Sequence, residues 1–456
     1  MQLDPVRTGH LSNRYHHLKS PALDGPPAQR DPAVIATVSR MLSEIEKGGI
    51  DRVMAYAATL DRWDGRDPEL SAAQIEQLID RIPADLREAL DVGRERTRAF
   101  AQLSRSQHSD FEAELVRGLV TGVRYVPVGR VGAYLPAGRF PLLASAFMTV
   151  NVAKAAGVPT VLACTPPQPD GQPDPAVLYA AHVCGADRIF VLGGVQALAA
   201  MAFGLLGEAP VDMLVGAGNA YVAEAKRQLF GAVAIDLLAG PSEVAVIADE
   251  TADPTLVAAD LLGQAEHGPD SPAALVTTSE ELGWRVVDEV ERQLSQLKTQ
   301  DIARVSWTNY GSIIVAESRE VVVELMDDLA PEHLEIMTSQ DDWYHDSLTN
   351  YGSIFLGTWS TVAYSDKGMA GTNHVLPTAG GARHSAGLSV SRFLKALTYQ
   401  RISQEATPLL ADPVATISEY EGMAAHGATA TLRTARLPRP LAGDPPLAAN
   451  APPRKA

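Results

Sequence analysis

The sequence predicts an α/β protein with two Rossmann-like parallel-sheet units, helices before them and a short helical tail after them. Three observations support this fold class. The chain has 456 residues, 46% of them hydrophobic, which is enough for two or more domains with large cores. Its N-terminal part shows the spacing of amphipathic helices. From residue 123 onward, short apolar runs alternate with alanine-rich helical stretches.

The helical part precedes the sheets. Residues 33–115 have apolar side chains at helical spacing, for example over 34–47 and 85–103, with Gly and Pro between the helices. The first 32 residues are polar and rich in Pro and His, and the last 20 contain six prolines. We therefore expect a poorly ordered extension over 1–32 and a disordered Pro-rich tail over 437–456.

Two sets of short apolar runs indicate the strands. The first set is Val123–Pro127, Val131–Tyr134, Val158–Ala163, Arg188–Leu192 and Met213–Val215. The second set is Val244–Ala248, Ala273–Thr277, Ser312–Ala316 and Leu334–Ile336. Strand–helix–strand repetition of this length implies parallel sheets covered on both faces.

Composition and charge argue against several classes of protein. The formal net charge is −17 and no Lys/Arg cluster occurs, which argues against a nucleic-acid-binding surface. Cys164 and Cys184 are the only cysteines, and their small apolar neighbours predict buried free thiols. No apolar run approaches the roughly 18 residues needed to cross a bilayer, and no apolar signal region is present. We expect a cytoplasmic protein with no membrane partner.

One group of polar residues has the composition of a metal site with a proton-transfer pair. Gln264 and His267 lie three apart near the end of an expected helix that begins with Asp253 and Pro254, so they share a face. Imidazole, carboxylate and amide groups suit Zn²⁺ or a similar metal. Each residue alone is more often an ordinary core or surface side chain. The other members of the group are Glu332, His333, Asp366 and His426.

Eight ordered motifs place this group in a wider setting. They are Val131–Gly138 (VGAYLPAG), Gly193–Ala197 (GGVQA), Gly218–Lys226 (GNAYVAEAK), Ala239–Glu243 (AGPSE), Gln264–Gly268 (QAEHG), Pro331–Leu334 (PEHL), Gly371–Thr378 (GTNHVLPT) and Glu421–His426 (EGMAAH). Through these motifs the chain resembles the histidinol dehydrogenase family over roughly residues 33–436.

The resemblance implies a domain plan. It implies an NAD-binding α/β domain over 131–241 and a metal and substrate α/β domain over 242–385. The helical segment 33–130 joins the metal and substrate domain, and residues 386–436 form a tail that completes a dimer.

The expected cofactor side consists of two strand-to-helix turns. Gly193–Gly194 and Gly216–Asn219 each follow an apolar run and open a helix, whose N-terminus can face phosphate. Neither turn is a complete GxGxxG, so spacing alone gives a weak dinucleotide signal, and such turns also serve as plain connections. The resemblance implies NAD contacts on Tyr134, Gln196 and Asn219.

The resemblance also implies a reaction centre. One Zn²⁺ per chain is implied, and the substrate is an alcohol oxidised through its aldehyde to a carboxylate by two hydride transfers. His333 can take the hydroxyl proton, and Glu332 is the candidate base for the water that adds to the aldehyde. Without the resemblance, Pro331–Leu334 is more simply a loop leading into a helix. The implied metal ligands are Gln264, His267, Asp366 and His426, and the implied substrate contacts include Ser242, His333, His374 and Glu421.

The tail carries a further implication about assembly. In this family Glu421 and His426 reach the site of the partner subunit, so a homodimer with shared sites is expected.

The chain departs from the histidinol-oxidising pattern at two cationic positions. Arg139 replaces a small or hydroxyl-bearing residue, and Lys367 replaces the Tyr that usually follows Asp366. Cations near the site disfavour a cationic substrate and favour a sulfonate, phosphate or carboxylate. The pairs Gly138–Arg139 and Asp366–Lys367 resemble those of the sulfopropanediol dehydrogenase branch of the family. However, eight steps separate Asp366 from His374 where the family generally has seven, and Arg139 and Lys367 are also consistent with plain surface charges.

Three functions remain open from the sequence. The first is a zinc- and NAD-dependent dehydrogenase of a small anionic diol such as 2,3-dihydroxypropane-1-sulfonate. The second is an L-histidinol dehydrogenase of histidine biosynthesis, which the retained His374 and Glu421 support. The third is a catalytically silent metal- or ligand-binding homologue, against which the intact Glu332–His333 pair argues.

Overall fold

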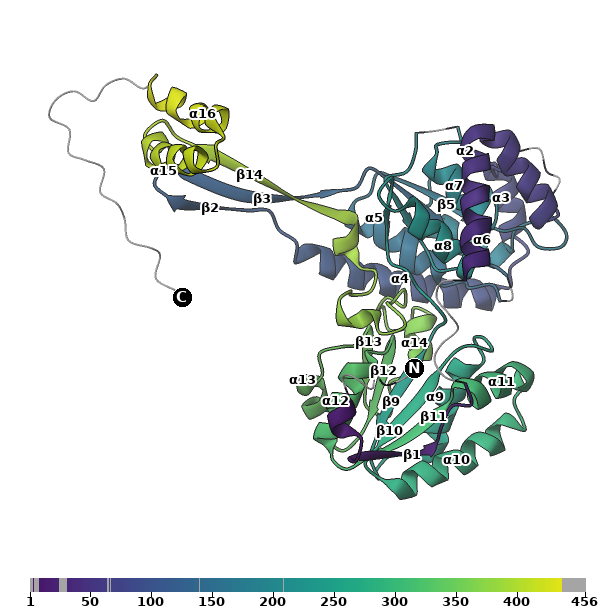
Figure 1. Cartoon of the computed structure of the whole chain (residues 1–456). Helices are drawn as coiled ribbons and strands as arrows, with labels where there is room; N and C mark the ends of the chain where they lie inside the picture. The colour runs from purple at the N-terminus through teal and green to yellow at the C-terminus, as the bar shows by residue number, and fades with distance from the viewer. Residues whose placement is uncertain are drawn as a thin grey trace. The chain divides into compact units, whose positions relative to one another are not determined.

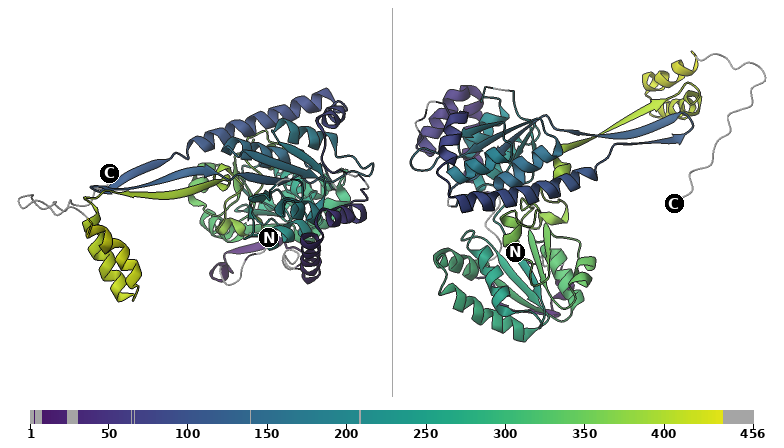
Figure 2. Two further views of the ribbon diagram at one scale, coloured as in Figure 1. Left: turned by 90° about the horizontal axis from the view of Figure 1, so that it is seen from above. Right: turned by 180° about the vertical axis from the view of Figure 1, so that it is seen from behind.

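The computed structural model describes residues 3, 8–23, 31–63, 65, 67–138, 140–207 and 209–436. The chain divides into two compact units, the first with residues 1–105 and 127–393 and the second with residues 106–126 and 394–456. The first unit contains two mostly parallel sheets, and the second contains a three-stranded sheet and a helix pair (Figures 1 and 2). The predicted α/β class, with N-terminal helices and a short helical tail, is confirmed.

The N-terminal helices begin where the sequence provides caps. They are α2 (Pro32–Leu60), α3 (Ala72–Ile79) and α4 (Ala84–Ser106). The Asp31 carboxylate accepts from the Ala33 N–H and Pro32 occupies the first turn, so α2 starts there. Gly49, with φ of 61°, kinks α2 at its middle. The helices predicted over 34–47 and 85–103 are confirmed, but residues 111–116 form a strand.

The first sheet is parallel and has the strand order β6-β5-β4-β7-β8. Its strands are β4 (Arg130–Tyr134), β5 (Thr160–Thr165), β6 (Arg188–Val191), β7 (Met213–Val215) and β8 (Ala234–Ile235). Its helices are α5 (Val152–Ala156), α6 (Pro175–Val183), α7 (Gly194–Ala202) and α8 (Ala220–Leu229). The strand order reverses at β4, and the crevice beyond the carboxyl ends of β4 and β7 is therefore the expected ligand position.

The second sheet has the order β1-β11-β10-β9-β12-β13, with the same reversal around β9. Its parallel strands are β9 (Val244–Ala248), β10 (Ala273–Thr277), β11 (Ser312–Ala316), β12 (His333–Met337) and β13 (Ser353–Leu356). Its helices are α9 (Pro254–Ala265), α10 (Glu280–Leu294), α11 (Gln300–Tyr310), α12 (Arg319–Leu329), α13 (Asp341–Ser347) and α14 (Val362–Asp366). Alternate residues of β9 enter two cores, one on each face, so the strand is buried throughout.

Residues 8–23 differ from the prediction of a poorly ordered extension over 1–32. Residues Tyr15–Lys19 form β1, which pairs antiparallel with β11 at the edge of the second sheet. Leu11, just before this strand, is fully buried in the core under the sheet. The polar composition concealed this strand because an edge strand buries little of its surface. The expectation of disorder over 437–456 concerns residues outside the described part of the chain.

The second unit joins two segments that are far apart in the sequence. Its strands are β2 (Phe111–Val116), β3 (Leu119–Pro127) and β14 (Leu394–Ile402), and its helices are α15 (Thr407–Tyr420) and α16 (Ala424–Thr434). β2 and β3 form an antiparallel hairpin, so the run at 123–127 is not the first strand of the parallel sheet, contrary to the prediction. The second unit therefore combines residues 106–126 with residues from 394 onward, whereas the predicted tail covered 386–436 alone.

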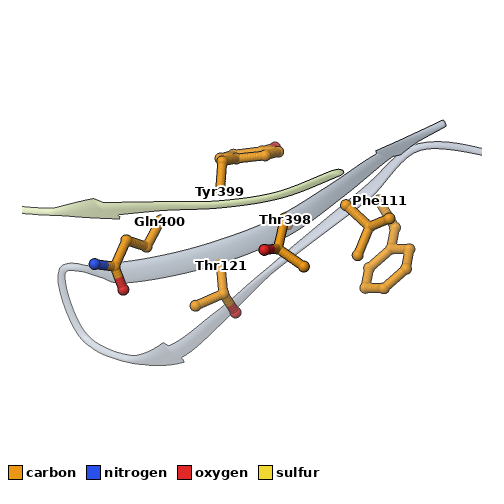
Figure 3. Close-up of a pocket in the computed structure, with 7 residues that line it drawn as sticks. Phe111, Thr121, Thr398, Tyr399 and Gln400 are labelled. Atoms are coloured by element: carbon orange, nitrogen blue, oxygen red, sulfur yellow. The ribbon is translucent and has the colours of Figure 1, made fainter. Parts of the chain in front are cut away.

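A pocket of about 590 Å³ lies on the sheet of this second unit, as Figure 3 shows. The ring of Tyr399 lies across Gly122, where a side chain would collide with it, and the Tyr399 hydroxyl donates to Glu112. The pocket is lined by Phe111, Thr121, Gly122, Val123, Thr398, Tyr399 and Gln400.

No helix in the described ranges combines the length and apolar character needed to cross a bilayer. Both cysteines are buried free thiols, as predicted.

Candidate active site

Helix α9 presents the first two candidate ligands at its C-terminal end. The Asp253 carboxylate accepts from the Thr255 N–H and so starts the helix as predicted. The helix ends at Ala265, which places His267 just beyond it, and the Gln264 Nε2 lies 3.5 Å from the His267 Nδ1. Gln264 is buried, and its Oε1 has no hydrogen-bond partner in the described structure. A buried acceptor without a donor is unfavourable unless a ligand satisfies it.

Asp366 ends the short helix α14 and lies between two imidazoles. Its Oδ2 is 3.8 Å from the His267 Nε2, and its Oδ1 is 3.9 Å from the His374 Nδ1. The apparent extra residue before His374 is accommodated in the turn that follows Asp366, where Gly368 and Gly371 both have positive φ. The insertion therefore does not separate Asp366 from His374.

These residues fall short of a complete metal centre within the part of the chain that the structure describes, where no cluster of three or more His, Cys, Asp or Glu is placed to bind a metal. What is present is an imidazole, a carboxylate and the unpartnered amide oxygen of Gln264. These three donor types fit Zn²⁺, which requires one further donor for a tetrahedral shell.

The pair Glu332–His333 lies at the amino end of β12 and is buried. The His333 Nδ1 lies 2.9 Å from the Glu243 carbonyl oxygen, which can only accept, so this nitrogen carries the proton. The His333 Nε2 is then a free acceptor, and it has no partner within the described ranges. Burial lowers the pKa of His333 to about 4, against the opposing charge of Asp366. The ring is therefore neutral at neutral pH.

Glu332 is held by two donors next to this ring. Its Oε2 accepts from the Ser242 Oγ at 2.7 Å and from the Glu243 N–H at 2.9 Å. Burial raises the pKa of Glu332 well above the usual 4.5, because the ionised carboxylate is poorly solvated there. Such a carboxyl group can accept a proton from water more readily than an exposed one.

Glu243 supports both members of the pair, a role that its motif, Ala239–Glu243, did not indicate. Its N–H donates to Glu332 and its carbonyl accepts from His333. Its buried carboxylate accepts from the Ala379 N–H at 3.0 Å, where the backbone has a positive φ of 52°. Burial raises the pKa of Glu243.

The predicted cofactor residues meet at the carboxyl edge of the first sheet. Tyr134 ends β4, and its hydroxyl accepts from the Gly194 N–H at 3.2 Å. Gln196 lies in the first turn of α7, which follows β6. Asn219 follows β7 and caps α8 by accepting from the Tyr221 and Val222 N–H groups. The structure thus brings Tyr134 and Gln196 to one turn and places Asn219 at the adjacent one.

The remaining predicted residues have different outcomes. Lys367 is exposed at the end of α14. Burial is the main cause of the lowered pKa of His374; the positive charge of Lys367 lowers this pKa further, while the negative charge of Asp366 raises it. Arg139 lies outside the described residues. Glu421 and His426 are exposed in the second unit, so their proposed place in the site is untested.

Comparison of the chain with protein families identifies the family to which it belongs. The model of the family described as histidinol dehydrogenase matches residues 26–434 of the chain. The chain belongs to the histidinol dehydrogenase family. It is therefore an oxidoreductase of that family.

Individual relatives of the chain agree with this assignment. A histidinol dehydrogenase homolog of Shouchella clausii is 46% identical over 400 residues, covering 88% of this chain and 94% of that protein. The sulfopropanediol 3-dehydrogenase of Ruegeria pomeroyi is 44% identical over 402 residues, covering 88% and 92%. The crystal structure of histidinol dehydrogenase from Elizabethkingia anophelis has a TM-score of 0.86 at 33% identity, covering 92% of this chain and 99% of that one.

A buried carboxyl pair lies behind the site in this histidinol dehydrogenase family member. Glu335 of β12 is fully buried, and its Oε1 accepts a hydrogen bond from the Val362 N–H at 2.8 Å. Its Oε2 has no hydrogen-bond partner in the described structure. Asp260 of α9 accepts from the Thr361 Oγ1 at 2.9 Å, and its negative charge acts on Glu335. Burial and the neighbouring Asp260 charge raise the pKa of Glu335 well above 4.5. The raised pKa favours the protonated form of Glu335, which can donate a hydrogen bond.

We expect Glu335→Gln to become stabilising relative to wild type as the pH rises. A carboxyl whose folded pKa is raised stabilises the fold below its unfolded pKa, and this stability is lost as the pH rises through the folded pKa. The loss is about 1.4 kcal/mol per pH unit between the two pKa values. The Gln amide donates to Asp260 without titrating. Melting temperatures from pH 5 to 8 measure the difference, with the exposed Glu317→Gln as control. Parallel curves for wild type and Glu335→Gln would contradict the expectation.

Proposed function

We propose that this chain is a zinc- and NAD-dependent dehydrogenase that oxidises a small anionic primary alcohol through the aldehyde to the carboxylate. The observation that carries the proposal is the His333 imidazole, which is neutral, buried and fixed with its Nε2 unpartnered among the described groups. Such an atom can accept the proton of a substrate hydroxyl as the hydride leaves its carbon.

Two oxidations place different demands on the pair. In each, His333 Nε2 can accept the hydroxyl proton, and an oxidised nicotinamide, when bound, would supply the acceptor for the hydride that leaves the same carbon. Between them, water must add to the aldehyde carbon, and Glu332 can take the proton that this water loses. The contacts from Ser242 and Glu243 hold the Glu332 carboxyl group in place for this step. The aldehyde hydrate then carries the hydroxyl that the second oxidation needs.

The donors for zinc in this proposal are Gln264, His267 and Asp366, together with His426. Zn²⁺ bound there would stabilise the negative charge that develops on the substrate oxygen. The support is the unpartnered Gln264 Oε1 and the spacing between His267 and Asp366.

We propose a homodimer in which the tail of one chain supplies His426 and Glu421 to the site of its partner. Both side chains are exposed within the single chain, so they are available to another copy. The three donors near His267 leave one position of a tetrahedral zinc shell unfilled.

The anionic substrate class rests on Lys367. Its ammonium group contributes to lowering the pKa of His374, an expected substrate contact, so a substrate anion bound at His374 would meet a positive charge. The relatives include both a sulfopropanediol 3-dehydrogenase and a histidinol dehydrogenase, so similarity alone leaves both substrates open. L-histidinol, which carries an ammonium group, is the second candidate, and the retained His374 favours it.

We expect wild-type protein to oxidise 2,3-dihydroxypropane-1-sulfonate well and histidinol poorly, and Lys367→Tyr to reverse part of this preference. A charge-assisted contact contributes about 1.5–3 kcal/mol, so kcat/KM for the sulfonate should fall roughly 10- to 150-fold. NADH formation by zinc-loaded protein measures both substrates, with Lys47→Tyr on α2 as an exposed control. Efficient histidinol turnover with unchanged sulfonate kinetics in Lys367→Tyr would favour the histidinol function. Turnover of neither would favour a silent homologue.

A further inference from the structure

The turn that begins α7 is supported by an acidic residue from a distant part of the sequence. Asp61 directly follows α2, and the backbone then turns at Arg62, where φ is 55°. The Asp61 Oδ2 accepts from the Gln196 Nε2 at 2.8 Å and from the Gly193 N–H at 3.3 Å. Asp61 therefore ties the end of α2 to the turn between β6 and α7.

This contact determines which way the Gln196 amide faces. A carboxylate only accepts hydrogen bonds, so the amide nitrogen must be the atom that faces Asp61. The Gln196 Oε1 is consequently directed away from Asp61. It is buried and has no hydrogen-bond partner in the described part of the chain.

The unpartnered oxygen lies at the first turn of α7. It is adjacent to Gly194, whose φ is 53° and whose N–H donates to the Tyr134 hydroxyl. Gly193 has no room for a side chain, because a Cβ there would lie 2.9 Å from the Asp61 carboxylate. The turn, Tyr134 and Asp61 are thus fitted to one another, and the Gln196 oxygen is left with an unused acceptor position among the described residues.

We propose that Asp61 is a positioning residue for the dinucleotide, which holds Gln196 so that its Oε1 accepts a hydrogen bond from a hydroxyl or amide N–H of the cofactor. The proposal rests on the NAD dependence proposed above. It also gives the interaction a direction: the cofactor donates and the protein accepts. Asp61 does not itself touch the cofactor.

A double-mutant cycle on NAD binding tests this assignment. Asp61→Ala and Gln196→Ala should each raise the Kd for NAD by about tenfold, the size of one hydrogen bond. The double variant should match Gln196→Ala alone, because Asp61 acts through Gln196. Isothermal titration calorimetry with NAD measures Kd. In turnover by Asp61→Ala, the KM for NAD should rise, while kcat and the KM for the alcohol stay near the wild-type values.

The controls separate positioning from stability. Asp31→Ala removes a comparable aspartate at the opposite end of α2, so it should lower the melting temperature and leave the Kd for NAD unchanged. The exchange of Asp61→Asn with Gln196→Glu keeps both shapes and reverses the hydrogen bond. It should bind NAD more tightly than Gln196→Glu alone, which tests the pair even if Asp61→Ala does not fold.

The outcomes also distinguish this inference from the proposed function. Wild-type protein that binds no NAD would overturn the NAD dependence itself. Wild-type protein that binds NAD, with an unchanged Kd in Asp61→Ala, would overturn the role of Asp61 alone. Additive losses in the double variant, or equal Kd values for Gln196→Glu with and without Asp61→Asn, would also overturn it.

Discussion

Glu332→Gln is expected to slow oxidation of the aldehyde by about 10²- to 10⁴-fold, the usual contribution of a general base, and to slow oxidation of the alcohol far less. Only the aldehyde half requires an activated water. The amide oxygen of Gln can still accept from Ser242 and from the Glu243 N–H, so the side chain should keep its position. Supplying alcohol and aldehyde separately and following NADH measures the two halves.

His333→Asn provides the matched comparison for that experiment. Both halves release a hydroxyl proton, so this variant should lose activity on alcohol and aldehyde alike. The Asn amide can still donate toward the Glu243 carbonyl, which His333 now does through Nδ1. Equal losses on both substrates in Glu332→Gln would mean that Glu332 is not the base for water.

His267→Ala and Asp366→Ala are each expected to lose zinc and activity together. Wild-type protein should contain about one Zn²⁺ per chain, since the site is proposed to be tetrahedral with a single ion. Removal of a ligand should weaken metal binding by at least about 100-fold, the upper range for outer-shell partners. Elemental analysis of purified protein gives the zinc content. His345→Ala, an exposed histidine on α13, should retain the metal. Full activity in zinc-free protein would refute the ligand assignment.

His267→Ala, combined with His426→Ala, also tests whether the site is shared between two chains. His426→Ala should be inactive alone, as should His267→Ala. Co-refolding the two should restore some activity, because one site of the mixed dimer receives His267 from one chain and His426 from the other. Absence of recovery, with dimers verified by sedimentation, would place His426 outside the partner's site.

Local signals in the sequence were sufficient for the helices and the central strands. Asp253 and Pro254 mark the start of α9, and the apolar run 244–248 is β9 as predicted, because caps and buried strands depend on neighbouring residues. The hairpin at 111–127 was predicted only in part, through the apolar run at 123–127 that belongs to β3. Every residue of β2 is exposed, so no buried face identified it as the partner strand.

The candidate site shows the same limit. Motifs indicated Glu332, His333, Gln264 and Asp366, but not the groups that orient them. Asp61 meets Gln196 across 135 positions of sequence, and Glu243 acts on the pair largely through its backbone. Neither contact has a signature in residue type or spacing. The tautomer of His333 likewise depends on a carbonyl that only the folded chain brings within reach.

The short strand β1 has a consequence for handling this protein. By pairing with β11 it covers the row of backbone N–H and C=O groups that would otherwise be open on the second sheet, and it presents the polar side chains of His16 and His17 to solvent. Short, charged edge strands hinder sheet-to-sheet association between molecules. We therefore expect β1 to limit association between molecules through this sheet. A variant without residues 15–19 would leave the edge of β11 open and should aggregate more readily than the full chain.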